Sequence, residues 1–279
     1  MTTELPYFDD FFERLARAPD SPFTRMFRRN LHWAYFAQPK DSDLSDAEFL
    51  AGAEAMTERV CRSARAADGL RILDVGCGHG GTIAHLNDRL SGCEFVGVNI
   101  DERQVAQARE HVTARPTNTV RFVVGDACAL PFPAGAFDAV LALECIFHFP
   151  SRRTFLGEAR RVLRPGGRLT FSDFVVDANK LDEMSAWMEA NPTAQGSYFG
   201  SITPAISSSS YARLGRAKGL ALAADEDVSA ETMPNYRFLK GFCAREAGLA
   251  EAVKSVAFLE EMAVRGFFQY RILSFERAS

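Results

Sequence analysis

The sequence Asp-Val-Gly-Cys-Gly-His-Gly-Gly, residues 74–81, joins a short apolar run to an amphipathic segment. Residues 72–75 predict a buried β-strand, and residues 81–90 predict a helix. A glycine-rich turn between a strand and a helix places backbone N–H groups and the positive helix end against a ligand. Gly76 and Gly78 permit tight turning and a close backbone approach that a Cβ atom would obstruct. The stretch therefore predicts a nucleotide-binding turn.

Strand-like and helix-like segments alternate on the C-terminal side of this turn. Further strands are predicted at 95–98, 120–124, 137–142, 168–172, 220–228 and 267–275, and helices at about 101–114, 152–163, 209–218 and 233–264. Strands separated by crossover helices of this length indicate right-handed βαβ units and a parallel sheet. The expected fold is α/β: a seven-stranded, mostly parallel Rossmann-like sheet with helices on both faces and an antiparallel last strand.

Four segments are expected along the chain. Apolar residues at helical spacing predict a helical cap over residues 1–68, ahead of a nucleotide-binding core at 69–177. Residues 190–212 contain no charged residue and are rich in Ser, Gly and Pro, which is typical of a functional lid. We therefore predict a lid that binds the acceptor at 178–212, while residues 213–279 complete the α/β core.

Composition excludes several classes of protein. The net charge of −4 provides no basic field for nucleic acid or an anionic membrane. No run approaches 18 apolar residues, and the N-terminus lacks the basic and apolar regions of a secretory signal. The six cysteines include no C-x-x-C pair, which fits a reduced, cytoplasmic setting. The 23 Phe residues favour an apolar pocket or interface; the alternative is that they only enlarge the hydrophobic core. A homodimer is an open alternative to a monomer.

The glycine turn alone fits two classes of nucleotide, because it satisfies both G-x-G-x-x-G and G-x-G-x-G. Asp74, two residues before Gly76, suits a cationic amino group and would repel a pyrophosphate. Asn99 stands where a dinucleotide site would hold an acidic residue for the ribose hydroxyls. Asp126 follows the third predicted strand, where a carboxylate can accept a hydrogen bond from an adenine amino group. Together these residues disfavour NAD.

Four motifs in this order resemble those of class I S-adenosylmethionine-dependent methyltransferases over about residues 70–175: residues 74–81, 98–100 (Val-Asn-Ile), 125–127 (Gly-Asp-Ala) and 163–167 (Leu-Arg-Pro-Gly-Gly). The resemblance implies that S-adenosylmethionine (SAM) is the cofactor. It assigns the methionine portion to Gly76 and Gly78, the ribose to Asn99, and the adenine ring to Asp126 and Ala127. Asn99 departs from the commoner acidic residue but can still hydrogen bond to hydroxyls. The other candidate cofactor-binding residues in the core are Asp74, Cys77, Ile100, Gln104 and Glu144.

Within this superfamily the chain is more similar to sterol-like, tocopherol-like and natural-product methyltransferases. Those enzymes often carry a His-aromatic-x-Tyr-aromatic segment before the core, comparable to residues 32–36 here. The resemblance implies that Tyr35 reaches the cofactor and closes over it. In the alternative interpretation, Trp33 and Phe36 only fasten the cap to the core.

Methyl transfer from a sulfonium requires alignment, exclusion of water and, for a weakly acidic nucleophile, a base. His148 follows the fourth predicted strand, so it is expected at the carboxyl edge of the sheet, where α/β proteins bind ligands. An imidazole can accept a proton at neutral pH, and resembling enzymes use a His four residues after a Glu as base. Asp173, at the end of the fifth strand, is expected to orient this imidazole or act beside it. Glu144 could cap a turn or touch the cofactor.

The remaining histidines are expected to have minor roles. His79 would shape the glycine turn, His32 would act only when the cap closes, and His85 and His111 would lie solvated on helices. No His and carboxylate pattern such as H-E-x-x-H is present, so no metal is expected.

These residues predict O-methylation of a phenolic or enolic hydroxyl on an apolar, polyketide-like secondary metabolite. A carbon methyltransferase, with Glu144 stabilising a carbocation, and a nitrogen methyltransferase, which needs little base, stay open. So does a SAM-binding protein that transfers no methyl group, such as a cyclase or a regulator. An oxidoreductase would require the glycine turn to bind NAD.

Overall fold

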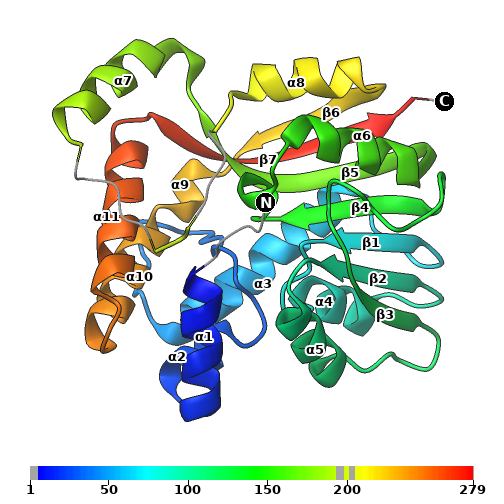
Figure 1. Cartoon of the computed structure of the whole chain (residues 1–279), viewed down its shortest axis with the longest axis horizontal. Helices are drawn as coiled ribbons and strands as arrows, with labels where there is room; N and C mark the ends of the chain where they lie inside the picture. Colours follow the sequence, from blue (N-terminus) through cyan, green and yellow to red (C-terminus); the bar gives the residue numbers. More distant parts are fainter. Residues whose placement is uncertain (1–5, 193–197, 201–204, 279) are drawn as a thin grey trace.

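A seven-stranded sheet lies at the centre of the molecule (Figure 1), in the order β3-β2-β1-β4-β5-β7-β6. The computed structural model describes residues 6–192, 198–200 and 205–278. The strands are β1 (Arg71–Val75), β2 (Glu94–Asn99), β3 (Thr119–Val124), β4 (Phe137–Leu143), β5 (Leu163–Val176), β6 (Leu220–Asp227) and β7 (Phe268–Arg277). Strands β1 to β5 pair in parallel, and β7 is antiparallel to both β5 and β6. The predicted mostly parallel sheet with an antiparallel last strand is confirmed.

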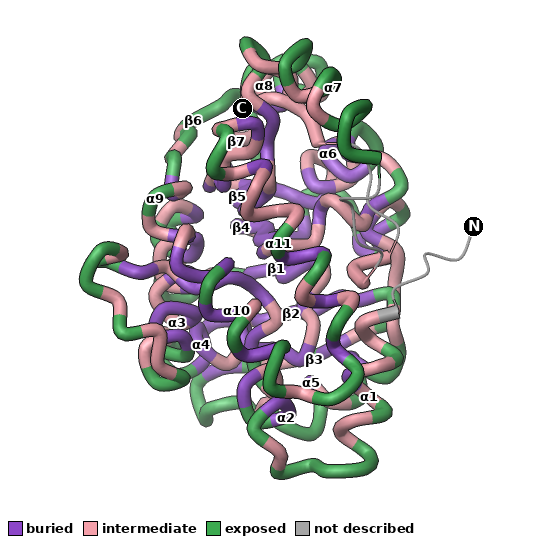
Figure 2. Tube along the Cα trace, turned by 90° about the vertical axis from the view of Figure 1, so that its left-hand side faces the viewer, coloured by how far each residue is buried: buried purple, intermediate pink, exposed green. Residues whose placement is uncertain are grey.

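Helices cover both faces of the sheet because its strands are apolar on both faces. Ile72 of β1 packs in one core cluster with side chains of several helices, whereas the next residue, Leu73, packs in a second cluster on the opposite face. The first cluster includes residues of α3 (Asp46–Ser63), α4 (Gly81–Arg89) and α5 (Glu102–His111), and the second includes residues of α6 (Arg152–Val162) and α8 (Ser208–Ala217). Figure 2 shows the central strands as the most continuously buried part of the chain.

Serine side chains fix where several of these helices begin. Ser21, Ser45, Ser151 and Ser207 each accept a hydrogen bond from the backbone N–H three residues later. Such N-caps satisfy one of the amide groups that a helix start leaves unpaired.

The remaining helices gather on one side of the sheet. They are α1 (Pro6–Arg17), α2 (Pro22–Phe27), η1 (Ile146–His148), η2 (Ala178–Lys180), α7 (Leu181–Ala190), α9 (Ser229–Thr232), α10 (Pro234–Arg245) and α11 (Ala250–Val264). Figure 1 shows α1, α2, α7, α10 and α11 beyond the carboxyl ends of the parallel strands. The expected cap contains α1, α2 and α3, but its residues 28–45 form bends and turns without helix, and its residues 1–5 lie outside the described chain. The expected lid at 178–212 includes α7 and the start of α8, while its residues 193–197 and 201–204 also lie outside.

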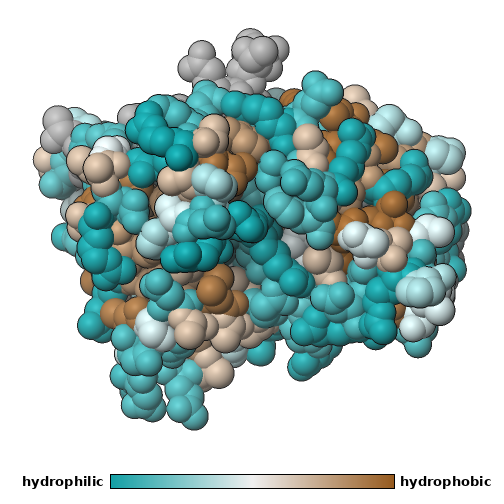
Figure 3. Space-filling model, turned by 90° about the horizontal axis from the view of Figure 1, so that it is seen from below, coloured by the Kyte–Doolittle hydropathy of each residue, from teal (hydrophilic) through white to brown (hydrophobic). Residues whose placement is uncertain are grey.

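The surface mixes hydrophilic and hydrophobic side chains. On the face seen in Figure 3, hydrophobic groups form small separate clusters between hydrophilic ones. Across the described ranges, no helix has both the length and the apolar character needed to cross a membrane.

The contact between α8 and β7 gives a test of the fold. A Cβ atom at Gly215 would lie 2.5 Å from Cε1 of Phe275, whereas one at Gly241 in α10 would meet no atom within 4 Å. We expect Gly215→Ala to lower the free energy of unfolding by about 1–3 kcal/mol through overpacking. Gly241→Ala is the matched control and should raise it by up to about 1 kcal/mol, since Ala favours helix. Urea unfolding measures both; equal effects would contradict the described packing.

Candidate functional site

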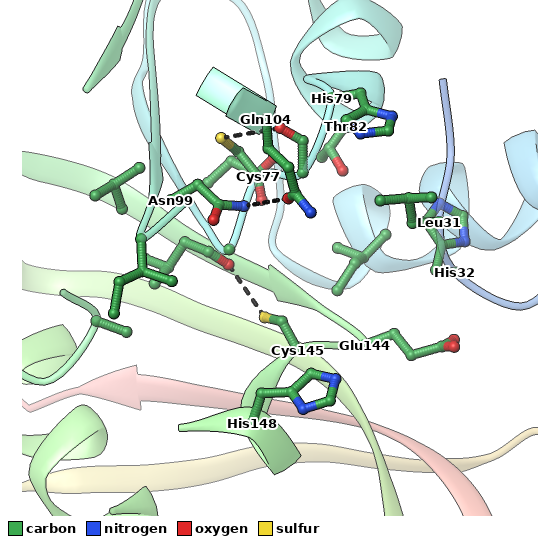
Figure 4. Close-up of a pocket in the computed structure, with 18 of the residues that line it drawn as sticks. Leu31, His32, Cys77, His79, Thr82, Asn99, Gln104, Glu144, Cys145 and His148 are labelled. Carbon is green, nitrogen blue, oxygen red and sulfur yellow. Dashed lines mark hydrogen bonds between the residues drawn. The ribbon is translucent and has the colours of Figure 1, made fainter. Parts of the chain in front are cut away.

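A pocket opens at the carboxyl ends of β1, β2 and β4. The strand order reverses between β1 and β4, and such switch points are where open α/β sheets bind ligands. The pocket brings together most of the residues predicted from the sequence: Asp74, Gly76, Cys77, Gly78, Asn99, Ile100, Gln104, Asp126, Ala127, Glu144 and His148. Figure 4 shows Asn99, Gln104 and Cys77 across this pocket from Cys145 and His148. The predicted Tyr35 and Asp173 are not part of its lining.

The glycine turn has a backbone that other residues rarely adopt. The φ angles of Gly76, Gly78 and Gly80 are +73°, +51° and +83°. A Cβ atom at Gly76 would also lie 2.7 Å from the sulfur of Cys145, which follows β4. At Gly78 the nearest atom would be 3.6 Å away, on Leu31. Packing against Cys145 therefore requires glycine at 76, while Gly78 leaves space for a ligand beside the turn.

Several buried polar atoms of this pocket have no hydrogen-bond partner within the described part of the chain. They are Oδ1 of Asn30, Oδ2 of Asp74, Nε2 of His79 and Nε2 of Gln104. Buried polar groups without partners are costly, so a ligand with matching groups is the simplest explanation of this arrangement. Asn99 donates to Oε1 of Gln104 over 2.8 Å, which orients the Gln104 amide (Figure 4). A cationic amine and ribose hydroxyls, as SAM carries, fit these donors and acceptors.

Asp74 is the charged group closest to the glycine turn in sequence. It is only 1% exposed near the end of β1. Burial raises the pKa of its carboxyl to about 8, although a hydrogen bond from Thr82 lowers this pKa in part. A buried carboxylate without an ionic partner is unfavourable. A cationic ligand group beside Asp74 would stabilise the ionised form and so contribute binding energy.

Glu144 fastens the cap to the sheet at this pocket. Its backbone has a φ of +49°, and its carboxylate accepts hydrogen bonds from the Trp33 N–H (2.7 Å) and the Tyr270 hydroxyl (2.5 Å). Burial raises the pKa of Glu144 to about 8, although the hydrogen bonds from Tyr270 and Trp33 oppose this. Glu144 therefore lines the pocket and also anchors the segment that contains Trp33.

Tyr35 points away from the pocket. Its ring packs 4.4 Å from the guanidinium carbon of Arg59, and its N–H donates to the Gly52 carbonyl over 2.9 Å. This backbone contact with α3 holds the segment, and the partly buried Tyr35 ring packs against the core instead of lining the pocket. The expectation that Tyr35 closes over the cofactor is therefore corrected in this structure. From the same aromatic stretch, Leu31 and His32 line the pocket instead.

Tyr7 of α1 is a site residue that the sequence did not reveal. Its hydroxyl lies 2.9 Å from Nε2 of His148, and its ring packs near Phe8 and Phe199. Burial, with the nearby Glu144, raises the pKa of Tyr7 well above its usual value, which keeps the phenol protonated. The apolar spacing in α1 predicted a helix, but it could not tell which aromatic residue would face the site.

Asp173 does not contact His148 in the part of the chain that the structure describes. Its Oδ2 lies 3.3 Å from both Nε and Nη2 of Arg152 and accepts a hydrogen bond from the Tyr211 hydroxyl. Because Asp173 is fully buried, this pairing with Arg152 offsets the cost of its desolvation. The expectation that Asp173 orients the imidazole is thus corrected: Tyr7 makes the contact described above.

Two other histidines have structural roles. His79 lies 3.2 Å from the carbonyl oxygens of Phe27 and Arg28, and burial lowers its pKa to about 4, so a neutral ring joins the turn to the end of α2. His85 was expected to be solvated, but it is 1% exposed and bridges Glu54 and Glu58 of α3 at 2.8 and 2.9 Å. Helical periodicity alone did not reveal that α3 covers this side of α4.

We call the pocket described above the cofactor-side pocket. A second cavity adjoins it, and we call this one the α7–α11 cavity. The two share Tyr7, Leu31, Glu144 and His148. Apart from Arg152, which pairs with Asp173, the walls away from this junction are mostly apolar, and they include Phe147, Phe174, Val176, Met184, Met188, Phe199, Phe258, Leu259, Met262 and Phe268. The expected lid contributes Met184, Met188 and Phe199. His148 therefore lies between a polar pocket and a mostly apolar cavity.

Comparisons with known proteins agree with this architecture. A family profile described as a methyltransferase domain matches residues 73–171. Methyltransferase GfsG of Streptomyces halstedii is 34% identical over 214 residues, covering 75% of this chain and 72% of that protein. The 27-O-demethylrifamycin SV methyltransferase of Amycolatopsis mediterranei is 32% identical over 216 residues, covering 76% and 74%.

Solved structures share the fold at lower identity. The [4+2]-cyclase SpnF has a TM-score of 0.74 at 22% identity, covering 98% of this chain and 93% of that one. The mycolic acid cyclopropane synthase CmaA1 has a TM-score of 0.75 at 15% identity, covering 96% and 94%. The sequence relatives, the family profile and the shared fold lead to one conclusion: the chain belongs to the class I SAM-dependent small-molecule methyltransferases.

Proposed function

We propose that the protein transfers the methyl group of SAM to a phenolic or enolic hydroxyl of an apolar, polyketide-like small molecule, with His148 as base. The observation that carries this proposal is the position of His148 where the cofactor-side pocket meets the α7–α11 cavity. A hydroxyl entering from the apolar cavity would meet an imidazole at the boundary with the cofactor. Imidazole is suited to accept its proton near neutral pH.

The names of sequence relatives support an oxygen acceptor. The rifamycin relative is named for a 27-O-demethyl compound, and an O-methyltransferase named cnsE, of Penicillium expansum, is 33% identical over 155 residues. The apolar walls of the α7–α11 cavity suit a molecule with little charge.

In this proposal the protein contributes mainly binding and alignment. Asp74 would hold the amine of SAM, Gly76, Cys77 and Gly78 its methionine portion, Asn99 with Gln104 the ribose, and Ile100, Asp126 and Ala127 the adenine. SAM supplies the methyl group and a good leaving group. The apolar walls would exclude water, and His148 would take the hydroxyl proton as the acceptor oxygen forms its bond to the methyl carbon.

A carbon acceptor is the second candidate. Glu144 also lies where the two cavities meet, and in its ionised form this carboxyl group can stabilise a carbocation. A sterol 24-C-methyltransferase of Gibberella zeae is 41% identical over 100 residues, although these cover only 26% of that protein. Replacing His148 distinguishes the two, because an alkene acceptor has no hydroxyl proton to lose at the start.

We expect His148→Ala to lower the rate of methyl transfer to a phenol by about 10²–10⁴-fold, since a positioned base contributes about that much. The loss should shrink for phenols that bear electron-withdrawing groups, because these ionise without help. Labelled SAM and a graded phenol panel measure the rates, and calorimetry should find SAM affinity little changed. An unchanged rate with every phenol would disprove the role of base.

The substitution Tyr7→Phe tests whether the Tyr7 hydroxyl positions His148 for catalysis. Loss of the 2.9 Å contact in Tyr7→Phe should lower kcat by about 5–10-fold, the effect of one hydrogen bond. In the double variant with His148→Ala, the Tyr7 substitution should have no further effect, because the two residues act as one unit. Tyr35→Phe is the matched control and should keep full activity, since its ring lies outside the pocket. Additive losses in the double variant would argue against this coupling.

Asp74 tests the cofactor assignment. We expect Asp74→Asn to weaken SAM binding by about 100-fold in calorimetry, because hydrogen bonds to charged groups contribute about 1.5–3 kcal/mol. Binding within a factor of three of the wild type would disprove an Asp74–amine contact.

The pH dependence of the free energy of unfolding tests the raised pKa of Asp74 without any ligand. An unfolded Asp has a pKa of about 3.9, whereas the pKa of folded Asp74 is about 8. Between these values the folded protein without ligand keeps a proton that the unfolded chain releases, so Asp74 makes the protein less stable as the pH rises. An Asn side chain does not titrate in this pH range, so the variant does not lose stability in this way. In urea unfolding, the stability of Asp74→Asn relative to the wild type should therefore increase from about pH 5 to about pH 8.

A further inference from the structure

A third cavity, which we call the aromatic chamber, lies among α1, α2, α10 and α11. Aromatic rings dominate its wall, including Phe11, Phe23, Phe27 and Phe49, and Val256 and Ala252 of α11 close it. Among the described residues that line it, Glu144 is the only Asp, Glu, Lys or Arg. This chamber therefore suits an uncharged group.

The aromatic chamber and the α7–α11 cavity meet at the site. Both are lined by Tyr7, Leu31, Trp33, Glu144 and Phe199, and the first two of these residues, with Glu144, also line the cofactor-side pocket. Tyr7 carries the hydroxyl that lies 2.9 Å from Nε2 of His148. Two apolar spaces thus extend in different directions from the place where the proposed base lies.

Empty space of this kind is unusual inside a protein. Interiors are packed as densely as organic crystals, and voids larger than a water molecule are few. The space that can hold the centre of a water-sized sphere is about 100 Å³ in the aromatic chamber and about 370 Å³ in the α7–α11 cavity. A terminal hydroxyl with a single apolar tail would need only one of these spaces.

We propose that the acceptor carries its methylated hydroxyl in the interior of an extended or macrocyclic apolar skeleton, with one uncharged arm in each cavity. This inference rests on the proposed function and adds the position of the hydroxyl within the substrate. The arm in the aromatic chamber packs against rings, while the other arm packs against side chains of α7 and α11. The hydroxyl lies between them, beside Tyr7 and His148.

The test compares two isomeric alcohols. Undecan-6-ol has five carbons on each side of its hydroxyl, and undecan-1-ol carries the same atoms with the hydroxyl at one end. Both are titrated into the full-length protein with S-adenosylhomocysteine bound, and their affinities are read from the displacement of N-phenyl-1-naphthylamine fluorescence. We expect undecan-6-ol to bind at least about fivefold more tightly, because each arm of five carbons buries apolar surface in its own cavity.

Two substitutions in α11 test whether each cavity holds one arm of the alcohol. Val256→Phe narrows the aromatic chamber and Leu259→Trp narrows the α7–α11 cavity, and each should remove the preference for undecan-6-ol. Val264→Phe, at a residue that is 67% exposed on the same helix, should leave it unchanged. Urea unfolding checks that the variants fold, and Ala252→Leu replaces Val256→Phe if that variant does not.

Equal affinities for the two alcohols, no displacement by either, or sensitivity to only one of the narrowing substitutions would overturn this inference. Methyl transfer is not needed for the binding measurement. If the preference holds but no hydroxyl is ever methylated, the proposed function fails while the two-armed site stands.

Discussion

The Glu144 carboxylate makes the contacts on which the arrangement of the site depends. It accepts hydrogen bonds from the Trp33 N–H in the cap and from the Tyr270 hydroxyl in β7. The backbone N–H of Glu144 donates a hydrogen bond to the Ser172 hydroxyl in β5. One residue thus joins the N-terminal segment to β5 and β7 at the carboxyl edge of the parallel strands. All three cavities are lined by Glu144, so this partly buried network fixes their common boundary. Hydrogen-bond networks of this kind make a site rigid.

The two sides of this boundary have opposite chemistry. On the cofactor side, Asp74 and Gln104 present buried atoms without partners in the described chain, and the glycine turn keeps the backbone open. On the acceptor side, rings and methionines provide apolar walls. In the proposed reaction, a sulfonium donor and an apolar acceptor would therefore bind in separate environments and meet near Tyr7, Glu144 and His148. This arrangement suits methyl transfer, because alignment and the exclusion of water provide most of its acceleration.

Most of the cofactor side could be predicted from the sequence because its residues are local. Gly76, Gly78, Asn99 and Asp126 each lie at the end of a strand or within three residues of it, so predicting the strands also placed these residues at one edge. Asp173 was placed by the same logic and Tyr35 by resemblance to related methyltransferases, yet the neighbours of both are long-range. Tyr35 packs on Arg59, and Asp173 pairs with Arg152 and Tyr211. Neither partner is adjacent in sequence, and a hydrophobic period does not specify which buried charges pair.

The sequence by itself determined the sheet, the order of its motifs and the methyltransferase family, because period, turn chemistry and the spacing of glycines are local properties of the chain. Only the tertiary structure decided that Tyr7 meets His148 across 141 positions, that His85 is buried between two glutamates, and that two apolar cavities join at Glu144. These features depend on how α1, α3 and α11 dock against the sheet. Docking is set by the fit of whole surfaces, which no short stretch of sequence contains.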